Sequence, residues 1–192
     1  MQQSINFSHL IGRTDGDKFM SSKINNDLVK KAQKGDADSF GELYEAYKDD
    51  MFRFAYYYTG SVSLSEDAVS EAALIAFQKL PQLRKTSAFK SWLFKILYNE
   101  CKAAQREKAL TARNSELSQV PSLTYDFADT NESIALKNAL SSLSEEEREI
   151  IILYFTCGYT SKEISEITGI KDATVRSKIS RATGKLRTML SM

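Results

Sequence analysis

The sequence predicts an all-α protein of two small helical domains joined by a flexible linker, the C-terminal domain being a helix-turn-helix. Three observations lead to this fold class. Apolar residues recur at spacings of three and four, which gathers them on one side of a helix. The 192 residues include only two prolines and eight glycines, so long helices are permitted almost everywhere. No segment alternates apolar and polar residues over enough positions to indicate a strand.

Composition, cysteine spacing and the length of apolar runs all favour a globular protein of the cytoplasm. Apolar residues make up 42% of the chain and charged residues 27%, which is the composition of a globular protein. Cys101 and Cys157 lie far apart and outside any metal-ligand spacing, which favours reduced thiols over a disulfide or a metal site. The longest purely apolar run, Ile150–Phe155, is too short to cross a bilayer, and residues 1–20 lack the apolar core of a signal peptide. We therefore expect a cytoplasmic protein.

The domain organisation follows from where the helical pattern begins, stops and resumes. Residues 1–26 are polar and lack periodicity, so they predict a disordered N-terminal tail, within which Met20 is an alternative start of the native protein. Helical periodicity covers residues 27–108, is lost over 109–131, and resumes over 132–192. The middle segment contains a proline and many Ser, Thr, Asn and Asp residues, which is typical of a linker.

Three helices are predicted in the first domain. The first carries a long apolar stripe formed by Phe40, Leu43, Tyr44, Tyr47, Met51, Phe54 and Tyr58. The second begins at a capping box of Ser63 and Glu66, in which side chains satisfy the free amides of the first turn, and ends at Pro81. Its inward residues are expected to be Ala68, Val69, Ala72, Ala76, Phe77 and Leu80. The third helix has an apolar side formed by Phe89, Trp92, Leu93, Ile96 and Leu97.

A basic segment surrounds the third helix, because residues 81–113 carry eight basic and two acidic side chains. Aromatic rings beside cations suit single-stranded nucleic acid, since a ring stacks on an unpaired base while cations follow the backbone. Phe89 and Trp92 are candidates for that role, although apolar residues spaced by three are also typical of a simple core. The polar loop before them is a better candidate for holding an extruded base, because its side chains need not pack. This loop consists of Arg84, Lys85, Thr86 and Ser87.

Residues 161–180 have the pattern of a helix-turn-helix. Ile164 and Ile167 form the inner face of its first helix, and Gly169 supplies the left-handed backbone that a short turn needs. Asp172 is placed to cap the second helix. Two further capping boxes accompany the motif, formed by Ser144 with Glu147 and by Thr160 with Glu163.

The second helix of this motif has an apolar side and a polar, basic side. The apolar side, which packs the helix onto its domain, is formed by Val175, Ile179, Ala182, Leu186 and Leu190. The outward side is formed by Thr174, Ser177, Lys178, Arg181 and Lys185, with Lys171 and Arg176 at its margin. Such a helix can enter the major groove of DNA, where arginine or lysine reads guanine and other side chains grip phosphates. The alternative is an ordinary helical hairpin with a solvated basic face.

These two blocks, in this order, resemble the sigma-70 family, specifically its extracytoplasmic-function (ECF) branch, in which only the second and fourth conserved regions are present. The first block carries DLVKKAQKGDADSFGELYEAYKDDMFRFA, then SEDAVSEAALIAF, then SAFKSWLFKILYNECKAAQREK. The second carries ALSSLSEEEREIIILYFTCGYTSKEISEITGIKDATVRSKISRATGKLR. The resemblance covers about residues 27–108 and 134–190, which is most of the chain.

The resemblance implies three working surfaces on a subunit that selects where RNA polymerase starts. Docking on the clamp helices of the largest polymerase subunit falls to Glu66, Asp67, Ser70 and Glu71. Recognition of the melted minus-ten element falls to the loop Arg84–Ala88 with Phe89, Trp92 and Asn99. Recognition of the minus-thirty-five element falls to Arg176, Ser177, Lys178 and Arg181. The implied partners are core RNA polymerase, promoter DNA and an anti-sigma factor, without a cofactor, a metal or a small-molecule substrate.

Three other interpretations compete with this one. A stand-alone helix-turn-helix regulator accounts for residues 132–192 but leaves the acidic helix and the basic loop of the first domain without a role. A sigma-like inhibitor, which binds polymerase and blocks initiation, is compatible with the same residues. An enzyme is not expected, because the sole histidine, His9, lies in the predicted tail, and the sequence has neither a phosphate-binding glycine loop nor a metal-spaced cluster.

Overall fold

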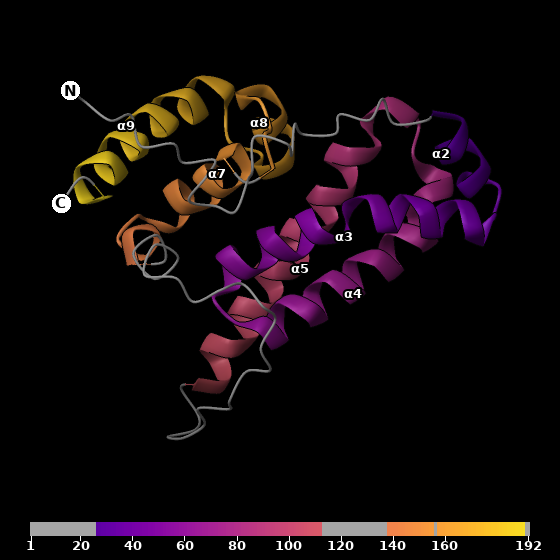
Figure 1. Cartoon of the computed structure of the whole chain (residues 1–192), viewed down its shortest axis with the longest axis horizontal. Coiled ribbons are helices and arrows are strands. Elements are labelled where there is room, and N and C mark those ends of the chain that lie inside the picture. The colour runs from indigo at the N-terminus through magenta and orange to yellow at the C-terminus, as the bar shows by residue number, and fades with distance from the viewer. Residues whose placement is uncertain (1–25, 113–137, 156, 191–192) are drawn as a thin grey trace. The chain divides into compact units, whose positions relative to one another are not determined.

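The computed structural model describes residues 26–112, 138–155 and 157–190, and these ranges contain helices and turns but no strand (Figure 1). The helices fall into two units, one with the helices up to residue 112 and one with those from residue 138 on. The predicted all-α fold class is confirmed. The predicted tail, apart from Asn26, and most of the predicted linker lie outside the described residues, and the domain limits stay predictions. No helix in the described ranges is both long enough and apolar enough to cross a membrane.

The first unit is built around α3. Its helices are α2 (Asn26–Gln33), α3 (Ala37–Thr59), α4 (Val62–Lys79) and α5 (Phe89–Ala112), with two 3-10 turns, η1 (Leu80–Gln82) and η2 (Thr86–Ala88), between the last two. Asp36 begins α3, because its carboxylate accepts hydrogen bonds from the amides of Asp38 and Ser39 at 3.1 and 3.2 Å. Gly60 ends α3 in the left-handed conformation, with φ +69°. The chain thus turns back at both ends of α3, which lets α3 pack against α2, α4 and α5.

The core of the first unit is a layer of aromatic and aliphatic side chains. Of the predicted stripe on α3, Phe40 and Tyr44 are half-buried, and the buried residues are Leu43, Tyr47, Met51, Phe54 and Tyr58. Phe54 meets Phe94 of α5 edge to face, with ring centroids 6.2 Å apart, and Tyr58 meets Tyr98 in the same way at 6.0 Å. Such pairs stabilise a core beyond the area that they bury, so α5 is held along α3.

The predicted capping box of α4 is wrong. The helix begins with Ser61 as its N-cap, so Ser63 and Glu66 are not the residues that close the first turn. Instead, the hydroxyl of Ser65 donates to the carbonyl of Ser61 and pairs with the hydroxyl of Thr59 at 2.9 Å. This hydroxyl cluster holds the start of α4, and Glu66 is exposed on the helix surface.

The second unit contains α7 (Glu145–Phe155), α8 (Ser161–Thr168) and α9 (Asp172–Leu190). Its core draws on all three helices and includes Ile150, Leu153, Ile164, Ile167, Val175, Ala182 and Leu186. Between α8 and α9 the chain turns at Gly169, whose φ is +80° and whose amide donates to the carbonyl of Ser165 at 2.9 Å. The predicted helix-turn-helix is therefore confirmed. Asp172 does not cap α9, because it is the first residue of the helix and its carboxylate pairs with Arg176 at 3.4 Å. The carbonyl of Lys171 accepts hydrogen bonds from the amides of Thr174 and Val175 at 2.8 and 3.0 Å.

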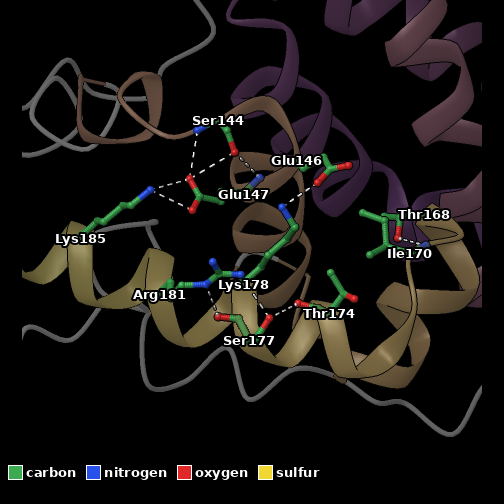
Figure 2. Close-up of polar contacts among 10 residues, drawn as sticks. All are labelled: Ser144, Glu146, Glu147, Thr168, Ile170, Thr174, Ser177, Lys178, Arg181 and Lys185. Atoms are coloured by element: carbon green, nitrogen blue, oxygen red, sulfur yellow. Dashed lines mark hydrogen bonds and ion pairs between the residues drawn. The ribbon is translucent and has the colours of Figure 1, made fainter.

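Both capping boxes predicted in this unit are confirmed, and one of them continues into an ion pair. Thr160 and Glu163 exchange hydrogen bonds at the start of α8. At the start of α7, the amide of Ser144 donates to Oε2 of Glu147 at 3.2 Å, and the amide of Glu147 donates to the hydroxyl of Ser144 at 3.3 Å. The Nζ of Lys185 on α9 donates to both carboxylate oxygens of Glu147 at 2.9 Å (Figure 2). Glu147, which is 8% exposed, thus fastens the start of α7 to α9.

The contacts of Glu147 make the stability of this unit depend on pH. The hydrogen bond from Lys185 holds the pKa of the Glu147 carboxyl below its usual value of 4.5, against the effect of burial, and the hydrogen bonds from Ser144 act in the same direction. A carboxyl whose pKa is lowered in the folded state adds stability at pH values above its unfolded pKa. That stability is lost as the pH falls through the lowered, folded pKa.

We expect the α7–α9 unit of the full-length protein to lose stability as the pH falls below about 4.5, as Glu147 takes up a proton. Glu147→Gln keeps the side chain's length and can still bond Ser144, but it has no charge to lose, so its stability should fall less over the same pH range. The measurement is the thermal melting temperature, followed through α7 amide signals by NMR, at about pH 6 and about pH 3. An equal loss in both proteins would contradict the role given to Glu147.

Two glycines of this unit are expected to respond to alanine with opposite signs. Gly169→Ala should lower the free energy of unfolding by about 1–2 kcal/mol, because the left-handed backbone is unfavourable for an L-residue. Gly184→Ala, in the interior of α9, should raise it by about 0.5–1 kcal/mol. An added Cβ meets no atom within 4 Å at either position, so backbone conformation alone separates the two. Hydrogen exchange of α9 amides measures both changes, and changes of the same sign would contradict the analysis.

Candidate nucleic-acid interfaces

The exposed side of α9 brings together three of the predicted DNA contacts, Thr174, Ser177 and Arg181. The hydroxyl of Ser177 donates to the carbonyl of Thr174 at 2.9 Å. The Nε and Nη2 of Arg181 donate to the carbonyl and hydroxyl of Ser177 at 3.3 and 3.4 Å (Figure 2). The guanidinium therefore lies along the exposed face, and most of its five N–H donors remain available to acceptors on a base or a phosphate. Lys171 and Arg176 are exposed at the start of the helix, as the sequence predicts.

Two lysines of the same predicted set are turned toward α7. The Nζ of Lys178 lies 2.6 Å from Oε2 of Glu146, and the lysine side chain is only 19% exposed. The Nζ of Lys185 bonds Glu147, although the side chain of Lys185 is 49% exposed. The prediction that Lys178 points outward is therefore wrong. Lys185 is exposed, as predicted, but its ammonium group pairs with Glu147. Each ammonium group contacts a carboxylate in the first turn of α7, so a contact with DNA phosphate has to compete with that carboxylate.

The polar loop between α4 and α5 is anchored by its backbone and exposed by its side chains. Arg84, Lys85 and Ser87 are exposed, and Thr86 is half-exposed. From α2, the Nε2 of Gln33 donates to the carbonyl of Leu83 at 2.7 Å and to that of Leu80 at 3.2 Å. One amide thus satisfies two carbonyls directly before the loop and fixes where the loop begins. The sequence did not point to Gln33, because its partners lie 50 and 47 residues away and leave no local pattern.

Of the two aromatic residues predicted beside this loop, Trp92 is accessible and Phe89 is not. Phe89 is 1% exposed and packs against Tyr47, with ring centroids 6.0 Å apart. It is a core residue, and the prediction that its ring stacks on a base is wrong. Trp92 is half-exposed and rests against Phe89, with centroids 6.1 Å apart. Asn99 is exposed about two turns further along the same side of α5, so Trp92 and Asn99 can meet one strand.

The residues predicted to dock on polymerase share one exposed side of α4: Glu66, Asp67, Ser70 and Glu71. The same side continues with Leu74, which is 51% exposed, and Phe77, which is 40% exposed. The prediction that Phe77 points inward is wrong, since its ring stays at the surface and meets Phe40 edge to face at 5.0 Å. Leu74 and Phe77 thus add apolar surface to the exposed side of α4.

The two cysteines and the acidic side chains of the described residues are the remaining candidates for reactive or metal-binding groups. Cys101 and Cys157 are both buried and form no disulfide, and burial raises the pKa of the Cys101 thiol. Over residues 26–112, 138–155 and 157–190, no three His, Cys, Asp or Glu side chains gather in a group that could hold a metal ion. The candidate sites are therefore exposed polar surfaces on α4, α5 and α9 and on the loop before α5.

Comparison with known proteins connects both units to one family. The sigma-70 region 2 profile matches residues 43–111, and the sigma-70 region 4 profile matches residues 133–186. The probable RNA polymerase sigma factor RfaY of Xanthomonas campestris is 29% identical over 83% of this chain and 42% of its own length. The ECF RNA polymerase sigma factors BldN of Streptomyces coelicolor and SigW of Bacillus subtilis are 28% and 27% identical over 85% and 84% of this chain. The chain spans 65% of BldN and 94% of SigW, and less than half of RfaY.

Solved structures agree with this assignment. The sigma factor RpoE in complex with the anti-sigma factor NepR from Bartonella quintana matches 81% of this chain and 99% of its own, with 25% identity and a TM-score of 0.69. CnrH in complex with the cytosolic domain of CnrY shares the fold, at 21% identity and a TM-score of 0.67 over 88% of this chain and 97% of its own. With a region 2 unit followed by a region 4 unit in one chain, the protein belongs to the sigma-70 family, in its ECF branch.

Proposed function

We propose that this protein is a promoter-specificity subunit of bacterial RNA polymerase, which binds the core enzyme, recognises promoter elements and helps to open the DNA strands. The observation that carries the proposal is the presence of both units in one chain, each with its candidate contacts on an exposed surface. A stand-alone regulator would need only α7–α9. It would leave the exposed acids of α4 and the anchored basic loop without a role.

The second unit would recognise the minus-thirty-five element as a duplex. Because Val175, Ala182 and Leu186 hold one side of α9 in the core, the opposite side is free to enter the major groove. Arg181 lies on that side with donors available for the two acceptors of a guanine edge. Lys171, Thr174, Arg176 and Ser177 would fix the helix on the groove walls through phosphate contacts, while Lys178 and Lys185 contribute only to the extent that α7 releases them.

The first unit would hold the minus-ten element after melting. Unpairing bases costs a few kcal/mol, and contacts to an extruded base offset part of that cost. Arg84, Lys85, Thr86 and Ser87 offer donors in a loop whose start is fixed by Gln33, so these side chains are positioned without being packed. Trp92 offers an accessible ring edge or face, and Asn99 a hydrogen-bonding group on the same side of α5.

The partners follow from these surfaces. Core polymerase would dock on the side of α4 formed by Glu66, Asp67, Ser70 and Glu71, with Leu74 and Phe77 adding apolar contact. An anti-sigma factor is a further partner, supported by the similarity to a sigma factor solved with one. We propose no catalytic activity, cofactor or small-molecule substrate for the chain itself, since nucleotide addition is performed by the core enzyme. The protein would act in the cytoplasm, where polymerase and promoter DNA are found.

The deciding experiment adds the purified protein to sigma-free core polymerase and maps transcript starts on a genomic DNA library. We expect defined starts that share two spaced upstream elements. Asp67→Arg should abolish them by placing a cation on the docking side of α4, whereas Asp49→Arg, an equal charge reversal at an exposed position of α3, should not. Tight binding to the core enzyme without any starts would favour a sigma-like inhibitor. Absence of binding to the core enzyme would favour a stand-alone regulator.

Once a promoter is known, Arg181→Ala should weaken binding of its minus-thirty-five duplex by roughly 1–3 kcal/mol and relax base choice at one position. The measurement is a fluorescence titration of full-length protein with the duplex and with variants of each base pair. Arg106→Ala removes the same side chain from an exposed position of α5 and serves as the control for general charge loss. If Arg181→Ala keeps the wild-type base preference, its assigned role is wrong.

A further inference from the structure

The two ion pairs between α7 and α9 differ in the burial of their carboxylates and in the number of hydrogen bonds that each carboxylate makes. Glu147 is 8% exposed, closes the capping box with Ser144 and bonds Lys185 through both oxygens, so it is part of the unit's structure. The side chain of Glu146 is 58% exposed, and Lys178 is its one partner within the described ranges. The Glu146–Lys178 contact can therefore open without disturbing the helix start.

Lys178 lies at the edge of the face that would meet DNA, between that face and the buried side formed by Val175 and Ala182. It follows Ser177 directly and stands four residues after Thr174 and three before Arg181, so it is a surface neighbour of both on the helix. Figure 2 shows the Lys178 side chain reaching from α9 to Glu146 on α7, while Arg181 and Ser177 lie on the α9 surface. The carboxylate of Glu146 thus already contacts a cation that borders the face that would meet DNA.

A carboxylate in that position has two effects on the binding of DNA. It contacts the ammonium group of Lys178, so that a phosphate can bind this lysine only by displacing Glu146 or sharing the cation with it. The negative charge of Glu146 also repels the phosphate backbone of DNA when the two come close. Both effects act on phosphate contacts, which are independent of base sequence, and leave the base contacts of Arg181 untouched.

We propose that Glu146 is a built-in competitor of DNA phosphate, which holds Lys178 and lowers the sequence-independent affinity of the α7–α9 unit for duplex DNA. This inference rests on the proposed function, because it assumes that α9 binds DNA. Glu146 is then a residue that sets the balance between base recognition and general attraction to DNA. Removing it strengthens binding to any duplex and makes that binding more dependent on salt.

The test uses full-length protein and a short, fluorescent duplex of random sequence. Glu146→Gln should raise the association constant roughly two- to fivefold above that of a control variant, which is the size of effect expected for an exposed ion pair. The control is Glu145→Gln, which removes the same charge from the neighbouring exposed position, where no partner is found within the described residues. Any effect of net charge or of the helix dipole is common to both variants, so their difference measures the contact with Lys178.

Two further measurements test whether the change in affinity depends on the Glu146–Lys178 ion pair. The slope of log K against log salt concentration should steepen by about 0.9 in Glu146→Gln relative to Glu145→Gln, because one more lysine reaches a phosphate. In a Lys178→Met background, the difference between the two glutamate variants should disappear. Circular dichroism and hydrogen exchange of α7 amides establish that all variants keep the fold.

Equal association constants and equal slopes for Glu146→Gln and Glu145→Gln would overturn the inference while leaving the proposed function intact, provided that the wild-type protein binds DNA. A difference that persists in the Lys178→Met background would also overturn it, since the effect would then not pass through Lys178. If neither the wild type nor any variant binds DNA, alone or with core polymerase, the proposed function fails and the inference fails with it.

Discussion

Each helix of the two units has to bury one side in a small core, and this constraint decides which residues are left for binding. Units of this size have room for a single layer of core, so a helix that packs on one side is exposed on the other. On α4, Ala68 and Ala72 are buried, while Asp67 and Glu71, one position before each, are exposed. On α9, Val175 is buried and the basic residues lie outside. The candidate binding surfaces on α4 and α9 are thus positioned by the packing of helices.

The fold was predictable because its determinants are local. The spacing of apolar residues on α3, the glycine that turns the chain between α8 and α9, and the two capping boxes of the second unit each involve residues within one or two helical turns. The capping box of α4 failed for a related reason. Thr59, Ser61 and Ser65 form a competing hydroxyl cluster just before and within the helix, and the sequence pattern of Ser63 and Glu66 contains nothing that reveals this competition.

The candidate sites were predictable as segments but only partly as side chains. Exposure along α4 and along the loop before α5 follows from helical periodicity and polarity, whereas the burial of Phe89 depends on Tyr47, which comes from another helix. The role of Gln33 could not be predicted for the same reason, since the carbonyls that it bonds lie on a different element. Phe89 and Gln33 nevertheless matter to the site. One supports the ring of Trp92, and the other holds the backbone from which the polar loop starts.

The pairing of α7 with α9 arises from two local preferences that meet only in three dimensions. Acidic residues at the start of α7 are favoured by the partial positive charge of a helix N-terminus. Basic residues on α9 suit a DNA-binding helix, and residues 171–192 carry six of them against one acid. In the folded unit, Glu146 and Glu147 compensate Lys178 and Lys185, so the positive charge available to DNA is smaller than the sequence of α9 suggests. Weaker attraction to the backbone leaves a larger share of the binding free energy to base contacts. That balance would suit the proposed promoter-specificity subunit, whose position on DNA would be decided by a promoter and by its polymerase.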